Sequence, residues 1–285
     1  MDGILIVNKP KNCTSHDVVY KVKKITNQKV GHTGTLDPMA TGVLPLLIGK
    51  GTLCSKYLIE HDKIYKATIQ LGQKTTTADQ EGEVIEEQEI ANNALEPQYV
   101  TKRLKEFLGK QIQTPPMYSA IKVNGKKLYE YARKGQNVEV PKREIEIYEI
   151  ELLNIDKQNK KIEYKVHCSK GTYIRSLCED IAEKLGTIGY MAELERLKVG
   201  KFILKNAVSI DDLEKEDIEK NIITIEEIFK NNEKINLTRK KLELFLNGVQ
   251  ITYDNPDGVY EIYCENKFIG TGTVKEKLLK RDVII

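Results

Sequence analysis

The sequence predicts an α+β protein with a small all-β unit at its C-terminal end. Residues 145–153 and 161–168 alternate between apolar and polar side chains, so we expect two antiparallel strands joined by a polar turn. Elsewhere, apolar residues recur at helical spacing behind Thr14 and Thr172, which are good helix caps. The last 50 or so residues contain short strand patterns and one short helical pattern.

Composition restricts the class of protein. The chain has 285 residues, with 45 Lys and Arg against 42 Asp and Glu, which gives a net charge of +3. This length fits one large domain, or a large domain and a small one. The longest N-terminal apolar run, Ile4 to Val7, is far too short for a signal peptide or a membrane span, so we expect a cytoplasmic protein. The five cysteines form no Cys-x-x-Cys pair and the four histidines no His-x-x-x-His spacing, so we expect no disulfide, metal or cofactor.

The N-terminal region predicts a strand followed by a helix. Residues 3–8 are apolar enough for a short buried strand, and Lys9-Pro10-Lys11-Asn12 predicts a turn. Thr14 and Asp17 have the spacing of a capping box at the start of a helix. The apolar face of that helix consists of Val18, Val19, Val22 and Ile25.

A glycine-rich stretch from Gly31 to Pro45 contains a single acid, Asp37. Pro38 disfavours helical angles at the residue before it, so Asp37 is presented from a loop. The stretch becomes apolar from Val43 onward, which indicates a loop leading into a buried strand or helix. Taken alone, it could equally be a structural turn, because Asp and Pro are common in turns.

Residues 64–72 alternate with period two and place Tyr65 on the apolar face of a strand. By itself this pattern fits a plain core tyrosine, since aromatic residues are enriched on half-buried strand faces. Residues 73–100 follow as a polar, acidic connection. Within it, residues 81–96 carry six acids and no base.

The segment 113–136 combines bases with aromatic residues around an Asn124-Gly125 turn, and we expect it to form a protruding lobe. The wider stretch 102–143 carries eleven Lys and Arg against three acids. Lysines can neutralise phosphates while tyrosines stack on unpaired bases, which is how loop RNA is usually held. The alternative is a solvated basic face.

The remaining segments complete the predicted elements. Thr172 should cap a helix that ends near Gly186, and Arg175 lies in its first turn, where the helix dipole disfavours a cation. We therefore expect a nearby carboxylate to hold Arg175. Residues 209–234 predict short helices or a linker. The C-terminal unit should contain a helix over 241–246 and strands over 259–264, 267–271 and 282–285.

Together these motifs resemble those of the TruB family of tRNA pseudouridine-55 synthases. The resemblance covers the whole chain, and the set of motifs in this order is highly specific. Two positions depart from the family pattern: Asn12 stands where glycine is usual, and the region after residue 235 is a short, divergent PUA domain. The matching motifs are Asn8 to Pro10, Thr14 to Val19, Gly31 to Gly42, Lys66 to Gly72, Pro116 to Ala120, Lys126 to Arg133 and His167 to Arg175.

The resemblance implies a pseudouridine synthase fold, with a mixed, mainly antiparallel sheet flanked by helices and a small, β-barrel-like PUA domain. It implies a catalytic domain over residues 1–230, with an RNA-binding thumb near 113–136, and a PUA-like RNA-binding domain over residues 235–285. The implied partner is the T-stem loop of tRNA. The implied protein is a monomer that needs no protein partner.

The implied reaction isomerises the T-loop uridine 55 to pseudouridine. It breaks the N1–C1′ bond, turns the base and rejoins it through C5, and the target nucleotide must first flip out of its stack. By the match, Asp37 is the catalytic aspartate, either a nucleophile at C1′ or a base that leads to a glycal intermediate. Arg175 pairs with it, and Tyr65 stacks on the uracil and can accept the C5 proton.

The resemblance also implies RNA contacts. His32 would fill or brace the space that the flipped nucleotide leaves. The other expected RNA-binding residues are Lys9, Lys66, Tyr118, Lys126, Lys127, Arg133 and Lys170.

Two other functions compete with this one. A non-catalytic RNA-binding or RNA-chaperone protein with the same fold would be expected to lose Asp37, Tyr65 or Arg175, and all three are present. The guide-RNA-dependent branch of the superfamily needs protein partners, whereas the bacterial-type thumb favours an enzyme that acts alone.

Overall fold

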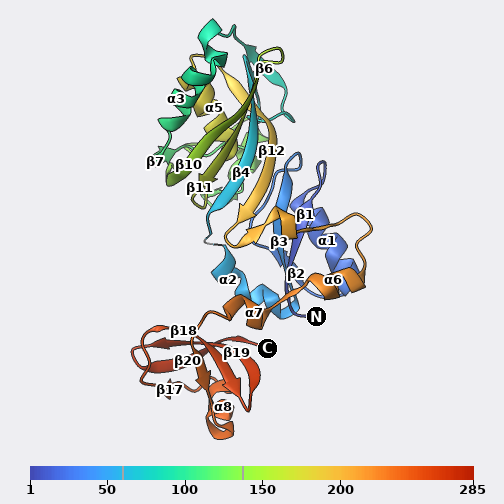
Figure 1. Ribbon diagram of the computed structural model, residues 1–285, viewed down its shortest axis with the longest axis vertical. Helices are drawn as coiled ribbons and strands as arrows, with labels where there is room; N and C mark the ends of the chain where they lie inside the picture. The colour runs from blue at the N-terminus through green and yellow to red at the C-terminus, as the bar shows by residue number, and fades with distance from the viewer. Residues whose placement is uncertain (60, 137) are drawn as a thin grey trace.

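The computed structural model describes residues 1–59, 61–136 and 138–285. Figure 1 shows an elongated molecule, with a long twisted sheet in its upper and middle parts and a small β unit at its lower end. Within the described part of the chain, no helix is long and apolar enough to cross a membrane.

The main sheet has eleven strands and a mixed, mainly antiparallel arrangement, so the α+β prediction is confirmed. Its path is β14-β1-β3-β12-β4-β11-β10-β7, and only the pairs β14–β1 and β3–β12 along it are parallel. Three short strands pair beside this path. The bounds along the path are β14 Val208–Ser209, β1 Gly3–Lys9, β3 Thr41–Ile48, β12 Gly189–Val199, β4 Lys63–Leu71, β11 Lys161–Cys168, β10 Arg143–Asp156 and β7 Gly109–Gln113. The short strands are β2 Val30–His32, β13 Phe202–Ile203 and β15 Ile223–Thr224.

The largest core lies between this sheet and two helices, α3 (Pro97–Lys105) and α5 (Ile174–Lys184). Alternation explains how the strands contribute to it, because β4 buries Tyr65, Ala67, Ile69 and Leu71 on one face. Strand β4 pairs with β12 on one side and β11 on the other, so it occupies the middle of the sheet (Figure 1).

The predicted N-terminal helix is α1 (Ser15–Thr26). Thr14 and Asp17 form the expected capping box, and the helix ends at Asn27, whose φ of 51° lies in the left-handed region. The prediction for α5 was wrong in one detail. Its N-cap is Tyr173, and the Thr172 hydroxyl instead donates to the Ser169 carbonyl, because residues 169–172 form a turn of their own.

Two segments form elements that the sequence analysis did not assign. The polar connection over residues 73–100 contains the hairpin β5 (Gln73–Thr75) and β6 (Val84–Glu87), the 3-10 helix η2 (Asn92–Leu95) and the first turn of α3. After β3 the chain also forms η1 (Gly49–Cys54) and the short helix α2 (Ser55–Leu58).

The 113–136 segment, called the lobe below, contains a hairpin and a short helix. Strands β8 (Lys122–Val123) and β9 (Lys126–Lys127) make a hairpin, and α4 (Leu128–Ala132) follows. Both loop residues have positive φ, 51° at Asn124 and 81° at Gly125, as a two-residue hairpin turn requires. Leu128 of α4 is fully buried, and its amide donates to the Ile121 carbonyl within the same segment.

The segment 209–234 contains the expected short helices, α6 (Lys215–Asn221) and α7 (Ile225–Phe229), and the 3-10 helix η3 (Leu204–Asn206) precedes it. The C-terminal unit is a five-stranded sheet with the order β16-β18-β19-β20-β17, accompanied by helix α8 (Arg239–Leu246). Its strands are β16 Lys234–Asn236, β17 Ile251–Thr252, β18 Gly258–Cys264, β19 Lys267–Lys275 and β20 Leu278–Ile284.

The C-terminal unit does not stand apart from the body. Tyr263, Phe268 and Val283 belong to the same apolar cluster as Ile4 and Val43 of the main sheet. A unit of about 50 residues buries too little surface to be stable alone, and this shared core supplies what it lacks.

Candidate active site

Asp37 lies in the loop between β2 and β3, and three contacts hold this loop in place. The Leu36 amide donates to the Ser15 hydroxyl at 2.9 Å, and that hydroxyl donates to the Leu36 carbonyl at 3.2 Å. The Lys9 ammonium donates to the Pro38 carbonyl at 3.1 Å. The residues on both sides of Asp37 are therefore fixed by the start of α1 and the end of β1.

Lys9 has a structural role in this loop. Its side chain is fully buried, and its ammonium donates to the carbonyls of Pro10, Cys13 and Pro38. Burial lowers the pKa of Lys9. The backbone carbonyls therefore occupy the Lys9 ammonium in this structure, and its contact with RNA stays a prediction.

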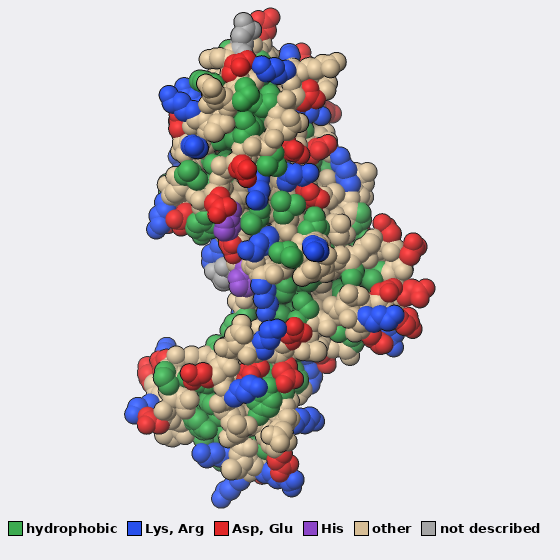
Figure 2. Space-filling model, viewed as in Figure 1, with side chains coloured by type: hydrophobic (Ala, Val, Ile, Leu, Met, Phe, Trp, Pro, Cys, Tyr) green, Lys and Arg blue, Asp and Glu red, His purple; other side chains and the backbone are tan. Residues whose placement is uncertain are grey.

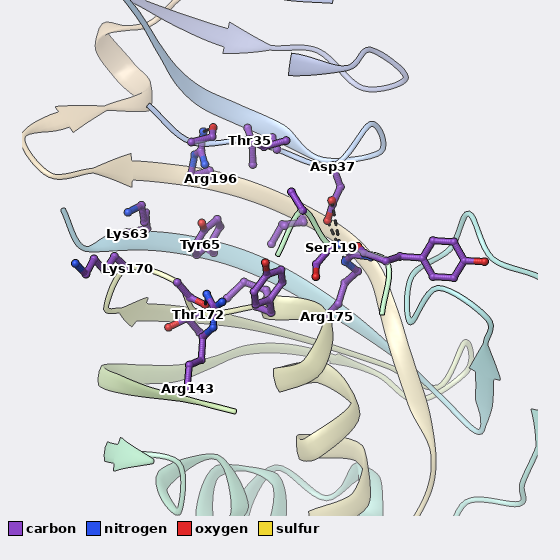
Figure 3. Close-up of a pocket in the computed structure, with 18 of the residues that line it drawn as sticks. Thr35, Asp37, Lys63, Tyr65, Ser119, Arg143, Lys170, Thr172, Arg175 and Arg196 are labelled. Atoms are coloured by element: carbon purple, nitrogen blue, oxygen red, sulfur yellow. Dashed lines mark hydrogen bonds and ion pairs between the residues drawn. The ribbon is translucent and has the colours of Figure 1, made fainter. Parts of the chain in front are cut away.

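The expected carboxylate partner of Arg175 is Asp37 (Figure 3). Arg175 Nε lies 3.2 Å from Asp37 Oδ2, and Nη2 donates to Oδ1 at 3.3 Å. Arg175 also donates to the carbonyls of Tyr118 and Thr77. Only 7% of Arg175 is exposed, so these contacts saturate a buried cation.

A second acid, Asp79, completes the group around Arg175, and no sequence pattern marked it. Arg175 Nη1 lies 3.5 Å from Asp79 Oδ2. Asp79 is 3% exposed, and its other oxygen accepts from the Thr77 hydroxyl at 2.6 Å and the Glu81 amide at 3.0 Å. The guanidinium is thus shared between two carboxylates, which fixes its plane.

Burial raises the pKa of Asp37, and the negative charge of Asp79 adds to this rise. The Arg175 guanidinium opposes it, since a nearby cation favours the ionised carboxyl. Asp37 is therefore more basic than an ordinary surface aspartate and still has a partner for its charge. Such a carboxylate suits attack on carbon or removal of a proton.

Tyr65 reaches the same site from β4, and it is 8% exposed. Its partner across the strand pair is Arg196 of β12, a residue that sequence reasoning missed. Arg196 is 2% exposed, and because the two residues are directly paired, its side chain lies on the same face of the sheet as Tyr65 and lines the same cavity (Figure 3). Because arginine is rarely buried, the sequence alone suggests an exposed side chain at this position.

These residues line a cavity of about 830 Å³ that opens on the side of the sheet where β4 and β12 meet the Asp37 loop. Tyr118, Tyr129 and Tyr173 supply aromatic surface, and Lys63, Arg143 and Lys170 supply positive charge. The volume is within the usual range for a site that encloses a small organic group. Further lining residues are Thr33, Gly34, Thr35, Leu36, Ser119, Ala120, Thr172, Ile174 and Leu194.

Two hydroxyls on the cavity wall have no hydrogen-bond partner among the described residues. Thr33 and Ser119 are each 5% exposed, and the side-chain oxygen of each is buried. Ser119 lies beside the Asp37–Arg175 pair in Figure 3. An unsatisfied buried hydroxyl costs about 1–3 kcal/mol, so both are placed to bond a polar ligand.

Five of the other predicted site residues lie in the cavity or on the lobe. Tyr118 and Lys170 line the cavity. Lys126, Lys127 and Arg133 lie on the lobe, where the Lys127 and Arg133 cations lie 5.3 and 5.4 Å from the centre of the Tyr129 ring.

His32 and Lys66 lie outside the cavity lining. The His32 ring is half-buried in β2, and its Nδ1 accepts from the Gly34 amide at 3.3 Å. Lys66 projects from the opposite face of β4, where it pairs with Glu163 and Glu195 at 3.5 Å each. Across the described residues, no three His, Cys, Asp or Glu side chains gather in a way that could hold a metal ion.

Two family models match consecutive parts of the chain. Residues 22–174 match the TruB family pseudouridylate synthase (N terminal domain), and residues 175–230 match the tRNA pseudouridylate synthase B C-terminal domain. A tRNA pseudouridine synthase B of Clostridium kluyveri is 43% identical over 97% of this chain and 96% of its own length. The same enzyme of Clostridium novyi is 44% identical over the full length of both chains.

Solved structures share the fold. The chain resembles a chain in the crystal structure of a Cbf5-Nop10-Gar1 complex, with a TM-score of 0.68, 25% identity and coverage of 99% of this chain and 83% of that one. An H/ACA RNP bound to a substrate RNA gives a TM-score of 0.68 at 23% identity, covering 99% of this chain and 85% of that one. With the Asp37–Arg175 pair, the cavity and these relatives in agreement, the chain belongs to the TruB family of tRNA pseudouridine synthases.

Proposed function

We propose that this protein converts the T-loop uridine 55 of tRNA to pseudouridine. The observation that carries the proposal is the buried Asp37–Arg175 pair on the wall of a cavity large enough for one nucleoside. The relatives that match over nearly their whole length are named tRNA pseudouridine synthase B.

The chemistry needs one carboxylate at C1′. Asp37 either attacks C1′ as the N1–C1′ bond breaks or takes a proton from the sugar to give a glycal. The released uracil turns while the cavity holds it, and C5 then bonds to C1′. The hydrogen on C5 leaves as a proton and N1 gains one, so the overall change is an isomerisation.

The aromatic and basic residues around Asp37 have matching roles. Tyr65 stacks on the uracil, and its phenol accepts the C5 proton. Arg175 keeps Asp37 aimed and ionised in a site from which water is largely excluded. His32, at the edge of the loop, fills the space that the flipped nucleotide leaves in the T loop.

The RNA backbone is held outside the cavity. Lys170 and Arg143 border the opening, and Lys126, Lys127 and Arg133 present positive charge on the thumb, residues 113–136. In Figure 2, Lys, Arg and His side chains also lie where the body narrows toward the C-terminal unit. A T-arm hairpin whose target nucleotide enters the cavity would be held at its backbone by these cations and by the thumb.

We assign residues 1–230 to the catalytic domain and residues 235–285 to a PUA-like, RNA-binding domain. The five-stranded sheet and α8 of the C-terminal unit support this assignment. We also propose that the enzyme acts in the cytoplasm as a monomer. It needs no protein partner, because the thumb gives it a way to grip RNA by itself.

The direct test is to incubate the purified protein with unmodified tRNA, with no other protein or guide RNA, and to map pseudouridine at single-nucleotide resolution. Pseudouridine at position 55 supports the proposal. If tRNA binds but no pseudouridine forms, the protein is a non-catalytic RNA-binding protein. If modification needs a guide RNA or further proteins, it works as the guide-dependent branch does.

A further inference from the structure

Arg196 is a buried cation that the reaction as proposed does not yet use. It lies in the middle of β12 and is 2% exposed. Among the described residues, no carboxylate forms an ion pair with it. Burying a charge without a partner is costly, so its position calls for an explanation.

Arg196 first of all holds backbone segments together. Arg196 Nε donates to the Val43 carbonyl at 2.7 Å, and Nη2 donates to the Gly34 carbonyl at 3.0 Å. The backbones also touch, since a Cβ on Gly42 would lie 2.3 Å from the Arg196 carbonyl oxygen. The arginine thereby joins β12 to the start of β3 and to the Asp37 loop.

These hydrogen bonds use Nε and Nη2 of the guanidinium and do not account for Nη1. Arg196 and Tyr65 are directly paired residues in the β12–β4 ladder, so their side chains lie next to each other on one face of the sheet, and both line the cavity. Burial raises the pKa of Tyr65, and the Arg196 charge opposes that rise. The cation is therefore placed where it can stabilise a negative charge on the phenol.

We propose that Arg196 is a positioning residue for Tyr65, which fixes the phenolic oxygen and stabilises the phenolate that takes the proton from C5. The inference rests on the proposed function. In this step the phenol first loses its proton to solvent. After C5 has bonded to C1′, the phenolate takes the C5 proton, the C5–H electrons restore the C5–C6 double bond, and solvent supplies the proton that N1 gains.

The charge arrangement fits this role. A cation beside a buried phenol favours the charged form, and a buried phenolate beside a guanidinium needs no other counter-ion. The site then contains two charged pairs. Asp37 with Arg175 acts at C1′, and Tyr65 with Arg196 acts at C5.

The test uses single-turnover kinetics with a T-arm RNA that carries deuterium at C5 of the target uridine. We expect Arg196→Lys, which keeps the charge but loses the planar fork, to slow turnover by about tenfold or more and to increase the deuterium isotope effect. RNA affinity should stay within about twofold, because Arg196 is buried. The matched control is Arg143→Lys, the same exchange at the cavity mouth, which should weaken RNA binding and leave the isotope effect as in the unchanged protein.

Two further measurements separate action through Tyr65 from fastening of the loop. In a Tyr65→Phe background, Arg196→Lys should cause no further loss of rate. Placing 3-fluorotyrosine, a more acidic phenol, at position 65 should restore part of the rate of Arg196→Lys. If the isotope effect stays the same and the two losses multiply, Arg196 only holds the loop and the proposal is wrong.

The proposal also has a test that does not depend on how the variant folds. With 3-fluorotyrosine at position 65 and Arg196 intact, the rise of the rate with pH that reports the phenol should move to lower pH. An unchanged profile overturns the proposal. These outcomes differ from failure of the proposed function, in which the unchanged protein itself forms no pseudouridine.

Discussion

The Arg175 guanidinium meets the Asp37 carboxylate with two nitrogens, Nε at 3.2 Å and Nη2 at 3.3 Å from its two oxygens. The two residues are 138 positions apart in the chain, one in a loop and one at the start of α5. A two-point contact fixes direction as well as distance, so the pair aims the carboxylate into the cavity.

Replacing Asp37 should abolish turnover without weakening the fold. We expect Asp37→Asn to form no pseudouridine while tRNA affinity stays within a few-fold, since phosphate and shape contacts supply most of the binding. Because burial raises the pKa of Asp37, its charged form does not stabilise the fold, and thermal unfolding should be little changed. Single-turnover assays and filter binding check this, and residual activity above about a tenth would contradict the assignment.

The pH profile should report the environment of Asp37. The reaction needs the ionised carboxylate, so kcat/KM should rise with pH through a pKa above that of an ordinary aspartate. The negative charge of Asp79 contributes to this elevation, so Asp79→Asn should move the acid limb to lower pH. Profiles of both proteins, with folding checked at each pH, are the measurement. An acid limb at or below the ordinary value in the unchanged protein would contradict the inferred environment.

Substitutions of Tyr65 should separate stacking from proton transfer. Tyr65→Phe keeps the ring and loses the hydroxyl, so RNA binding should persist and turnover should fall sharply. Tyr65→Ala loses both. Thermal melting measured beside the kinetics distinguishes a core role, in which Ala would unfold the protein before it slowed the reaction. A folded and fully active Tyr65→Phe would remove the hydroxyl from the mechanism, and the inference about Arg196 with it.

The thumb should contribute charge to RNA binding. Lys126→Ala combined with Lys127→Ala should weaken tRNA binding and reduce the slope of log affinity against log salt by roughly one to two units. The rate on bound RNA should change much less. Lys23→Ala with Lys24→Ala, at exposed positions on α1, is the matched control and should leave the slope unchanged.

Proteolysis gives a second measurement of the same segment. The Asn124-Gly125 turn is exposed, so limited digestion there should be fast in the free protein and suppressed by tRNA. Equal digestion with and without tRNA, together with an unchanged salt slope, would mean that the basic lobe is only a solvated face.

Phe229 should prove important for the stability of both units. It is 4% exposed, and its ring packs edge-on against Tyr57 with the centroids 5.0 Å apart. Removing a buried phenylalanine side chain costs about 3–5 kcal/mol, so Phe229→Ala should lower the free energy of unfolding by about that amount. Chemical denaturation measures it, with Phe229→Leu as the milder control. A loss below about 1 kcal/mol would show that the cluster tolerates the cavity.

The sequence predicted those strands and helices whose own residues carry a clear apolar pattern. The strands that include Ile4, Tyr65 and Tyr164 were predicted because their apolar residues alternate. Strand β12 was missed, because its Glu, Arg, Lys and Leu residues favour helix locally and only pairing with β4 and β3 makes it a strand.

The site shows the same division. Asp37 could be found because glycines and a proline mark its loop, and the position of Arg175 at a helix start indicated an anionic partner. Asp79 and Arg196 could not be found. Each acquires its role from a neighbour distant in the chain, and the sequence around each resembles an ordinary polar surface.

The apolar cluster that joins Tyr263 and Phe268 to Val43 affects how this protein can be dissected. Cutting the chain before the C-terminal unit would leave a large apolar surface bare on the back of β1 and β3, and such surfaces drive aggregation. Inactivity of a truncated enzyme would therefore say nothing about RNA contact by the removed part. Charge reversal at an exposed residue such as Lys240, which leaves the buried seam intact, isolates that contact.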